Sequence, residues 1–432
     1  MLQLLPLALA LGNLHRLDDA AVCTTTTVSA DSGRPKRICL LGLFGMENYG
    51  NDGSLEAILM FLRQTWPDAL YSCVCIKPQK VQHDHRLPAI SISWPGFASS
   101  VLRFCDKITA TLPHKLGNWI QAISHLRKFD VLIVPGTSTL CDYRASPFGA
   151  PYAIFRWAVS ARLCGTKLCF VSTGAGPIQH RLSRWMLTYV AKSACYRSFR
   201  DGVSRDFLAG LGIDTRHDAI YPDLAFKLPT PQPIAAPASQ SSMVTVGIGM
   251  MSYNGWHGHT SSDDTIYTTY LMKMARFTGL LLDRGYRVRL LVGEASDQRA
   301  VADLHTALAL QGYTSPSGQV ITDPVNSLHD LMRQMEDNAV VVASRFHNVI
   351  CALKLARPTI SIGYEAKHDA LMREMGLGDF CQHIEHLDVN RLMQQTTQLM
   401  GRASAYEEQI REKLLDIESR IAEQELHLRR IL

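Results

Sequence analysis

The sequence predicts an α/β fold of two doubly wound, Rossmann-like domains that face each other across a cleft. Two long regions share one rhythm, in which a short apolar strand is followed by an amphipathic helix. Between them, residues 229–242 are rich in proline, serine and alanine and show no periodicity, as expected of a linker. Alternating strands and helices favour parallel sheets covered by helices on both faces, and 432 residues are too many for a single core.

The first domain is expected over residues 36–228. Glycine, asparagine or proline follows each of its apolar strands and favours a turn there. The strands are expected at Ile38–Phe44, Val131–Val134 and Lys167–Ser172. The helices are expected at Ser54–Thr65, Tyr152–Cys164 and Leu182–Ala194.

The second domain is expected over residues 243–403, and two such domains around a linker are the GT-B-like layout. Its strands are expected at Val244–Met250, Val288–Gly293, Val340–Ser344 and Thr359–Gly363, with helices that include Thr268–Asp283 and Asn348–Leu355. Residues 404–432 lack glycine and proline and predict one long helix with an apolar stripe of Ile410, Leu414, Ile417, Ile421 and Leu428. We expect this helix to pack back across the molecule; a coiled coil with a partner is the alternative.

Residues 1–35 are expected to form a disordered leader. Met1–Gly12 is apolar, but it is too short to span a bilayer and lacks the basic start of a secretory signal. The formal charge of +5 suits an anionic small substrate or loose contact with lipid headgroups, and no nucleic acid is expected as a partner. We expect a cytoplasmic protein, with peripheral association at the inner face of the membrane left open, as is the oligomeric state.

The eleven cysteines form no C-x-x-C pair, and reduced structural thiols are the favoured interpretation. Cys73 with Cys75, and Cys381 with His383 and His386, come nearest to metal-ligand spacing, yet neither has a second half. We therefore expect no metal.

Polar and glycine-rich segments follow the expected strands, where ligands of open parallel sheets bind. The first, Gly45–Ala57, carries Asn51 and Asp52 ahead of a helix, but it is neither a Walker A loop nor a dinucleotide fingerprint. The next two contain Gly136 with Thr137, and Gly174. Each segment taken alone is equally consistent with a tight or capped turn.

Charged residues follow three further strands. Arg200 precedes Asp201 and Ser204, Pro222 precedes Asp223, and the second domain carries Arg345, His347, Tyr364 and Lys367 at two adjacent strand ends. Cations beside new helix N-termini favour an anion site. His347 could instead be a core histidine, and Arg345 could pair with Asp337 or Glu336.

In this order, the motifs resemble the polysaccharide pyruvyltransferase family. They are Asn48–Ala57, Gly136–Thr139, Arg200-Asp201 with Ser204, Pro222-Asp223, Arg345-Phe-His347 and Tyr364-Glu-Ala-Lys367, and the match covers about residues 36–385. The resemblance implies a GT-B-like fold, phosphoenolpyruvate as co-substrate, no organic cofactor, and His347 as the catalytic residue, with Arg200 and Lys367 binding the donor. The sequence departs from the family at Pro135–Ser138, where the family often has three glycines.

From these residues we expect pyruvate transfer to a pair of sugar hydroxyls as a ketal, with phosphate release. His347, with its pKa raised by nearby anions, is expected to be the general acid, and Asp52 or Asp223 the base. The first domain is expected to hold the sugar or lipid-linked oligosaccharide acceptor and the second most of the donor site, with Tyr253 and Trp256 stacking on a sugar or shielding the cleft. The alternatives are a nucleotide-sugar glycosyltransferase of the same layout and a non-catalytic glycan-binding relative.

Overall fold

The computed structural model describes residues 34–97, 99, 111–143, 145–231, 243–255, 261–313 and 319–432. Within it, Lys36–Leu432 forms one compact unit. Most of the expected leader and linker lie outside the described residues, and so does Trp256. No helix in the described ranges is long and apolar enough to cross a membrane.

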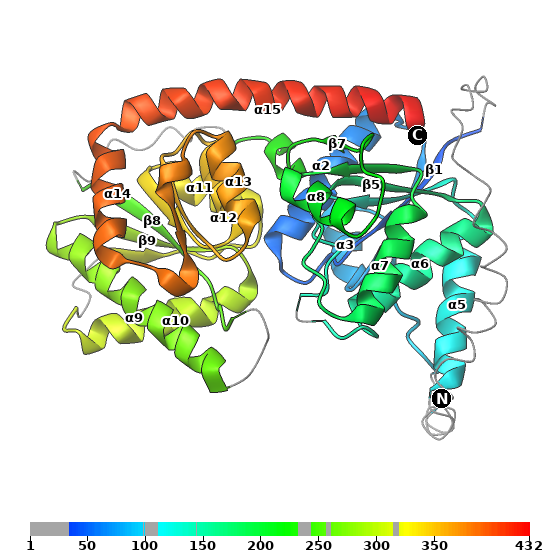
Figure 1. Ribbon diagram of the computed structural model, residues 1–432, viewed down its shortest axis with the longest axis horizontal. Helices are drawn as coiled ribbons and strands as arrows, with labels where there is room; N and C mark the ends of the chain where they lie inside the picture. The colour runs from blue at the N-terminus through cyan, green and yellow to red at the C-terminus, as the bar shows by residue number, and fades with distance from the viewer. Residues whose placement is uncertain are drawn as a thin grey trace. The chain divides into compact units, whose positions relative to one another are not determined.

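The N-terminal domain is built on a seven-stranded parallel sheet in the order β3-β2-β1-β4-β5-β6-β7 (Figure 1). The order reverses at β1, so that the helices before and after the reversal cover opposite faces of the sheet. The strands are β1 (Arg37–Leu41), β2 (Leu70–Cys75), β3 (Ala89–Ser91), β4 (Val131–Pro135), β5 (Lys167–Thr173), β6 (Tyr196–Phe199) and β7 (Ala219–Ile220). The helices are α2 (Tyr49–Thr65), α3 (Pro78–His85), α5 (Leu112–Leu126), α6 (Ala150–Cys164), α7 (Arg181–Lys192), α8 (Gly202–Gly210) and the 3-10 turn η2 (Leu224–Lys227).

The C-terminal domain repeats this plan on a six-stranded parallel sheet in the order β10-β9-β8-β11-β12-β13. Its strands are β8 (Thr245–Met250), β9 (Arg287–Val292), β10 (Val320–Thr322), β11 (Asn338–Ala343), β12 (Thr359–Gly363) and β13 (Cys381–His383). Its helices are α9 (Ser261–Asp283), α10 (Gln298–Leu310), α11 (Leu328–Met335), α12 (Phe346–Lys354), α13 (Ala366–Glu374) and α14 (Val389–Gly401), with turns η3 (Ala295–Asp297), η4 (Gly378–Phe380) and η5 (Ile384–His386). The predicted fold class, two sheets of parallel strands alternating with helices, is confirmed.

The first helix differs from its prediction, because α2 begins at Tyr49 and not near Ser54. The Asn48 side chain caps it by accepting a hydrogen bond of 3.1 Å from the backbone N–H of Asn51. Gly50 and Gly53 therefore lie within the helix, where packing rather than a turn requires them. The prediction that the helix starts only near Ser54 is wrong, because glycine, a strong turn signal in a single sequence, serves packing inside this helix.

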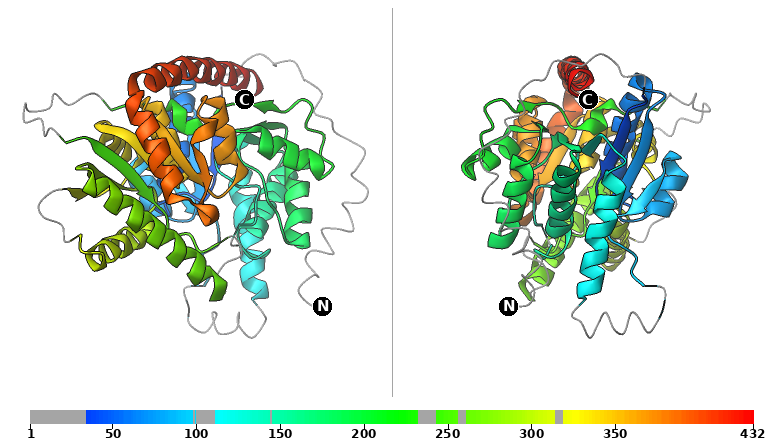
Figure 2. Two further views of the ribbon diagram at one scale, coloured as in Figure 1. Left: turned by 60° about the vertical axis from the view of Figure 1, so that its left-hand side comes forward. Right: turned by 90° about the vertical axis from the view of Figure 1, so that its right-hand side faces the viewer.

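The long helix α15 (Ala403–Ile431) packs along both domains (Figures 1 and 2). In the C-terminal domain the Gln409 side chain donates a hydrogen bond of 2.8 Å to the carbonyl of Gly376. In the N-terminal domain the buried Gln424 amide donates to the hydroxyls of Ser172 and Ser198 at 2.8 and 3.1 Å. The helix therefore connects the two domains through contacts that are independent of the 229–242 segment.

Candidate functional site

A cavity of about 470 Å³ lies between the two domains, at the carboxyl ends of their strands. On the N-terminal side, Ser138, Gly174 and Arg200 line it from the segments that follow β4, β5 and β6. On the C-terminal side, Tyr364 and Lys367 line it from the segment that follows β12. The segments that follow these four strands of two sheets therefore converge on one space, as expected of a ligand site in this fold.

Arg200 lies at the floor of this cavity and is almost fully buried, with 3% of its side chain exposed. Its Nη1 donates to Asp223 at 3.0 Å, and its Nη2 donates to the Ser138 hydroxyl at 2.5 Å. Burial lowers the pKa of Arg200, but the charges of Asp223 and Asp201 outweigh burial, so that its pKa is raised and the group stays charged. A Cβ at Gly174 would lie 2.8 Å from Nη2, so only glycine leaves room for this guanidinium.

Lys367 lies across the cavity from Arg200, with 12% of its side chain exposed. Its Nζ donates to Glu365 at 2.7 Å and lies 5.6 Å from the ring centre of Phe346, against whose ring the Arg200 guanidinium also packs. Burial is the main reason that the pKa of Lys367 is lowered, and the charge of Arg200 acts in the same direction. No side chain caps α13, so N–H groups at its N-terminus, next to Lys367, are left available to bind an anion.

His347 lies in the first turn of α12, behind Arg200 and Asp223, and does not line the cavity. Its Nε2 lies 3.8 Å from Oδ1 of Asp223 and has no hydrogen-bond partner, and 17% of the side chain is exposed. Its ring packs on Gly50, where a Cβ would lie 1.9 Å from Nδ1. The contact accounts for a glycine inside α2.

The expectation that anions raise the pKa of His347 is wrong for the unliganded site. Burial is the main reason that the pKa of His347 is lowered to about 4. The charge of Asp223 raises this pKa, but the charges of Arg200, Lys367 and Arg345 lower it further, so the net shift is downward. Asp223 cannot offset these effects because it is already paired with Arg200, so the imidazole is neutral near pH 7. His347, Arg200 and Lys367, which are far apart in the sequence, are nevertheless close enough to influence one another's charge.

Arg345 is held by two carboxylates other than the pair considered from the sequence. Its guanidinium donates to Asp297 at 2.7 and 2.8 Å and pairs with Glu294 at 2.9 Å. Glu294 also accepts a hydrogen bond of 3.0 Å from the Asn48 side chain, which connects this cluster to the N-terminal domain. Arg345 therefore joins the domains here, and Asp337 and Glu336 are not its partners.

Three residues predicted to bind substrate support the site from outside the cavity. Gly136 has a φ of +59° and packs where a Cβ would lie 2.7 Å from Ser54, while its carbonyl accepts a 3.4 Å bond from Arg200. Thr137 is buried, and its carbonyl accepts a hydrogen bond from the backbone N–H of Gly174 at 3.2 Å. The Asn51 amide donates to the backbone carbonyl of residue 43 at 3.4 Å.

Asp52 lines a different cavity, of about 540 Å³, which it shares with Lys80, Asp84 and His85. Its Oδ1 accepts a 2.7 Å hydrogen bond from the backbone N–H of Gly45 and so fixes the segment before α2. Burial raises the pKa of Asp52. Asp52 lies in the first turn of α2 and does not line the cavity of Arg200 and Lys367.

Sequence reasoning missed three residues of the site. Ser138 lines the cavity and directly follows Gly136 and Thr137 in the sequence. Its hydroxyl, next to two residues predicted to bind substrate, is the sequence feature that indicates it. Glu365, which pairs with Lys367, lies inside the Tyr364–Lys367 motif at a position that the motif leaves free. His368 is fully buried, with Nδ1 3.2 Å from the Ser361 hydroxyl, and burial lowers its pKa well below the usual range.

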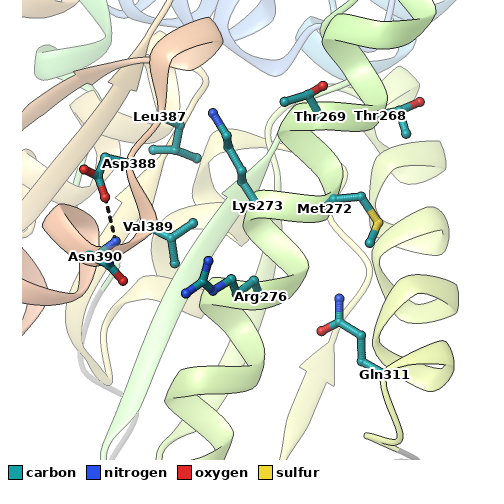
Figure 3. Close-up of a pocket in the computed structure, with 10 residues that line it drawn as sticks. All are labelled: Thr268, Thr269, Met272, Lys273, Arg276, Gln311, Leu387, Asp388, Val389 and Asn390. Atoms are coloured by element: carbon teal, nitrogen blue, oxygen red, sulfur yellow. Dashed lines mark hydrogen bonds between the residues drawn. The ribbon is translucent and has the colours of Figure 1, made fainter.

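A third cavity, of about 920 Å³, lies in the C-terminal domain between α9 and the start of α14 (Figure 3). Lys273 and Arg276 line it, but Asp388 already caps α14 through the N–H groups of Asn390 and Arg391. None of the predicted site residues faces this space, and we assign it no role despite its volume. In the described part of the chain, no three metal-ligating side chains come together.

Two solved structures with the same architecture define the fold as GT-B-type. UDP-GlcNAc 2-epimerase from Neisseria meningitidis, bound to UDP-GlcNAc, superposes with a TM-score of 0.55 at 10% identity, covering 91% of this chain and 100% of that one. An apo structure of OtsA superposes with a TM-score of 0.54 at 11% identity, covering 91% of this chain and 98% of that one. At such low identity the likeness concerns the fold alone.

The sequence profile of the polysaccharide pyruvyl transferase family matches residues 48–366, a segment that contains nearly all the residues described above. The chain belongs to this family, as its motifs predicted, and membership implies a transferase. It is also 21% identical over 305 residues to the amylovoran biosynthesis protein AmsJ of Erwinia amylovora, covering 67% of this chain and 70% of that protein.

Proposed function

We propose that this protein transfers the pyruvyl unit of phosphoenolpyruvate to two hydroxyls of a glycan as a ketal and releases phosphate. The observation that carries the proposal is the 470 Å³ cavity between Arg200 and Lys367, which come from different domains. Family membership supports transfer of a pyruvyl group. The name of AmsJ supports an acceptor in exopolysaccharide or cell-surface glycan synthesis, free or lipid-linked.

The donor would bind where the N-terminus of α13 meets Lys367. Phosphoenolpyruvate carries a phosphate and a carboxylate, both of which suit free N–H groups at a helix start and an ammonium point charge. Lys367 can turn to the donor by leaving Glu365, its sole hydrogen-bond partner among the described residues. Arg200 contributes a fixed positive charge, since its Nη1 and Nη2 donate to Asp223 and Ser138, while its buried Nε has no hydrogen-bond partner within the described ranges and is a donor left for the ligand.

The reaction needs one proton delivered and two removed. Protonation of the methylene carbon of the donor makes the phosphate-bearing carbon cationic, and the first sugar hydroxyl adds there and returns its proton to the group that protonated the carbon. The second hydroxyl then displaces the phosphate, whose departure carries away the second proton. No cofactor or metal is required by this sequence of steps.

His347 is the residue we assign to proton transfer, with Asp223 as its positioning residue. Because the ring does not line the cavity, this assignment requires the ring to turn toward the donor or the donor to reach past Arg200. The imidazole is neutral in the empty site because its pKa is about 4. A bound trianion would raise that pKa and favour uptake of the proton that the donor carbon receives. We assign no proton transfer to Asp52, whose cavity is separate, and Asp223 has both oxygens engaged by Arg200 and by the N–H of Ala225.

The acceptor would enter against the N-terminal wall of the cavity, beside Ser138 and Gly174. Tyr253 and Tyr364 close the opposite wall with ring centres 5.5 Å apart, and the Tyr253 hydroxyl is fixed by a 2.6 Å hydrogen bond to Glu385. Such paired rings can stack on a sugar or shield the cavity from water.

The proposal is tested by incubating the purified protein with phosphoenolpyruvate and candidate glycans while following phosphate release and product mass. Lys367→Ala and His347→Gln should each lower turnover roughly 100-fold or more, the range for loss of a charged binding group or a proton-transfer group. Lys273→Ala and His305→Gln are matched controls, because both side chains lie on other parts of the C-terminal domain. Full turnover by the two site variants would refute the assignment.

Two other outcomes would replace the proposal. Release of a nucleoside diphosphate from a nucleotide sugar, with no phosphate from phosphoenolpyruvate, would make the protein a glycosyltransferase. Glycan binding without any calorimetric signal for phosphoenolpyruvate would make it a non-catalytic relative.

A further inference from the structure

The N-terminal domain carries an unusual distribution of charge. Residues 107–200 contain 13 lysines and arginines but only two aspartates and no glutamate, a balance of +11 in a chain whose total is +5. This segment includes α5, α6 and α7, which pack side by side on one face of the sheet (Figures 1 and 2). None of the three helices contains an acidic residue.

Exposed cations lie at the ends of these helices. They are Arg127 and Lys128 after α5, Arg162 in the last turn of α6, and Arg181, Arg184 and Lys192 at the two ends of α7. Arg156 is the exception, since it is buried and bonded to the backbone carbonyl of Ile92. The outer surface of the three-helix layer is therefore positive and has no carboxylate on its helices to neutralise it.

The same layer exposes large apolar side chains. Leu112, Leu116 and Ile120, spaced by four residues on one face of α5, are 38%, 61% and 59% exposed. Phe148, just before α6, is 61% exposed, and Trp185 on α7 is 39% exposed. Scattered apolar residues are normal at a protein surface, but a helix stripe with further exposed aromatic residues in the same carboxylate-free layer marks an interaction surface.

We propose that this surface, the outer face of α5, α6 and α7, docks on an anionic phospholipid membrane. Leucine, isoleucine, phenylalanine and tryptophan side chains can enter the headgroup region, while arginine and lysine contact the phosphates. The absence of acidic residues from all three helices is the complement of an anionic surface. A protein partner would not require such a depletion, and nucleic-acid binding has no use for an apolar stripe along α5. No residue of these three helices lines the 470 Å³ cavity, and the inference does not depend on the proposed chemistry.

Cosedimentation of the full-length protein with vesicles tests the proposal. Vesicles of phosphatidylcholine with phosphatidylglycerol should bind the protein, vesicles of phosphatidylcholine alone should bind it far less, and salt should weaken the binding. Leu116→Gln with Ile120→Gln should weaken partitioning roughly tenfold or more. Arg181→Gln with Arg184→Gln should weaken it about 25-fold, since each cation near an anionic surface contributes roughly a factor of five.

Matched control variants distinguish binding through this surface from nonspecific binding to vesicles. Lys273→Gln with Arg276→Gln removes two cations at the same spacing on α9, and Leu310→Gln with Leu415→Gln removes two exposed leucines elsewhere. Both control pairs should bind vesicles like the unaltered protein. Because Met1–Gly12 is also apolar, only the differences among variants decide the matter. Equal binding by all four variants would overturn the proposal, and so would a dimer that the Leu116/Ile120 pair dissociates without any vesicle binding.

Discussion

Replacing His347 by glutamine should make the protein less sensitive to acid. In the folded protein the pKa of this imidazole is about 4, compared with the ordinary value of 6.5 for histidine, chiefly because the ring is buried. As the pH falls below about 6.5, the unfolded chain takes up the proton first, so stability is lost until about pH 4. Linkage gives a loss of roughly 3 kcal/mol at the acid end and about 2 kcal/mol at pH 5.

The assay is chemical denaturation of the unaltered protein and His347→Gln at pH 7 and pH 5. The drop in unfolding free energy between these pH values should be smaller in the variant by about 2 kcal/mol. His125→Gln is a matched control, since burial lowers the pKa of His125 to about 4 as well, and this histidine lies in the last turn of α5, outside the site. Both variants should lose less unfolding free energy between pH 7 and pH 5 than the unaltered protein. Phosphoenolpyruvate should stabilise the unaltered protein and His125→Gln more at pH 5 than at pH 7, whereas its stabilisation of His347→Gln should not increase at pH 5. An identical pH dependence in His347→Gln and the unaltered protein would refute the buried, neutral imidazole.

Three further changes test the remaining contacts. Glu365→Gln removes the carboxylate that holds Lys367, so the KM for phosphoenolpyruvate should fall several-fold in steady-state assays of phosphate release. Gly174→Ala places a Cβ 2.8 Å from Nη2 of Arg200, and kcat/KM should fall roughly 10- to 100-fold as the guanidinium shifts. Ile417→Ala, in the part of α15 that is buried between the domains, should lower the unfolding free energy by about 2–4 kcal/mol in denaturant titrations.

Two of these changes have a control substitution of the same kind. Gly210→Ala adds a Cβ at a helix end with no atom within 4 Å and should leave kcat/KM unchanged. Leu415→Ala removes a side chain that is 68% exposed on α15, and its effect should stay within about 0.5 kcal/mol. An unchanged KM in Glu365→Gln, normal activity in Gly174→Ala, or equal losses for Ile417→Ala and Leu415→Ala would contradict the corresponding contact.

The fold class could be predicted because hydrophobic period is a local property. Strand Val340–Val342 is a continuous apolar run, and the observed β11 is buried at these residues, as expected of a parallel sheet covered on both faces. The sequence also places Arg200 and Lys367 just after strands. Because the carboxyl ends of parallel strands lie along one edge of a sheet, both side chains are predicted at the edge where ligands bind. The helix start at Tyr49 was missed because capping by Asn48 outweighs the turn preference of two glycines.

The pairings within the site could not be predicted, because they join residues far apart in the chain. Arg345, which follows β11, bonds to Asp297, which lies 48 positions earlier and follows β9; strand β8 lies between these two strands in the sheet. Asp223 meets Arg200 from the next strand, and this pairing leaves His347 with a neighbouring carboxylate that does not raise its pKa above the usual value. Local sequence shows which side chains can be charged, whereas their protonation follows from how many partners and how much water remain after folding.

The charge balance of the site bears on ligand choice. Arg200 and Lys367 each have a carboxylate partner, so an anion gains little by approaching two cations whose charges are already compensated. A monoanion cannot compensate for separating Lys367 from Glu365, whereas a donor with a phosphate and a carboxylate can replace that partner and add bonds to the start of α13. The same added charge would favour a proton on His347, which the empty site disfavours. Occupancy by a multiply charged donor and readiness for proton transfer would thus be coupled through the same electrostatic field.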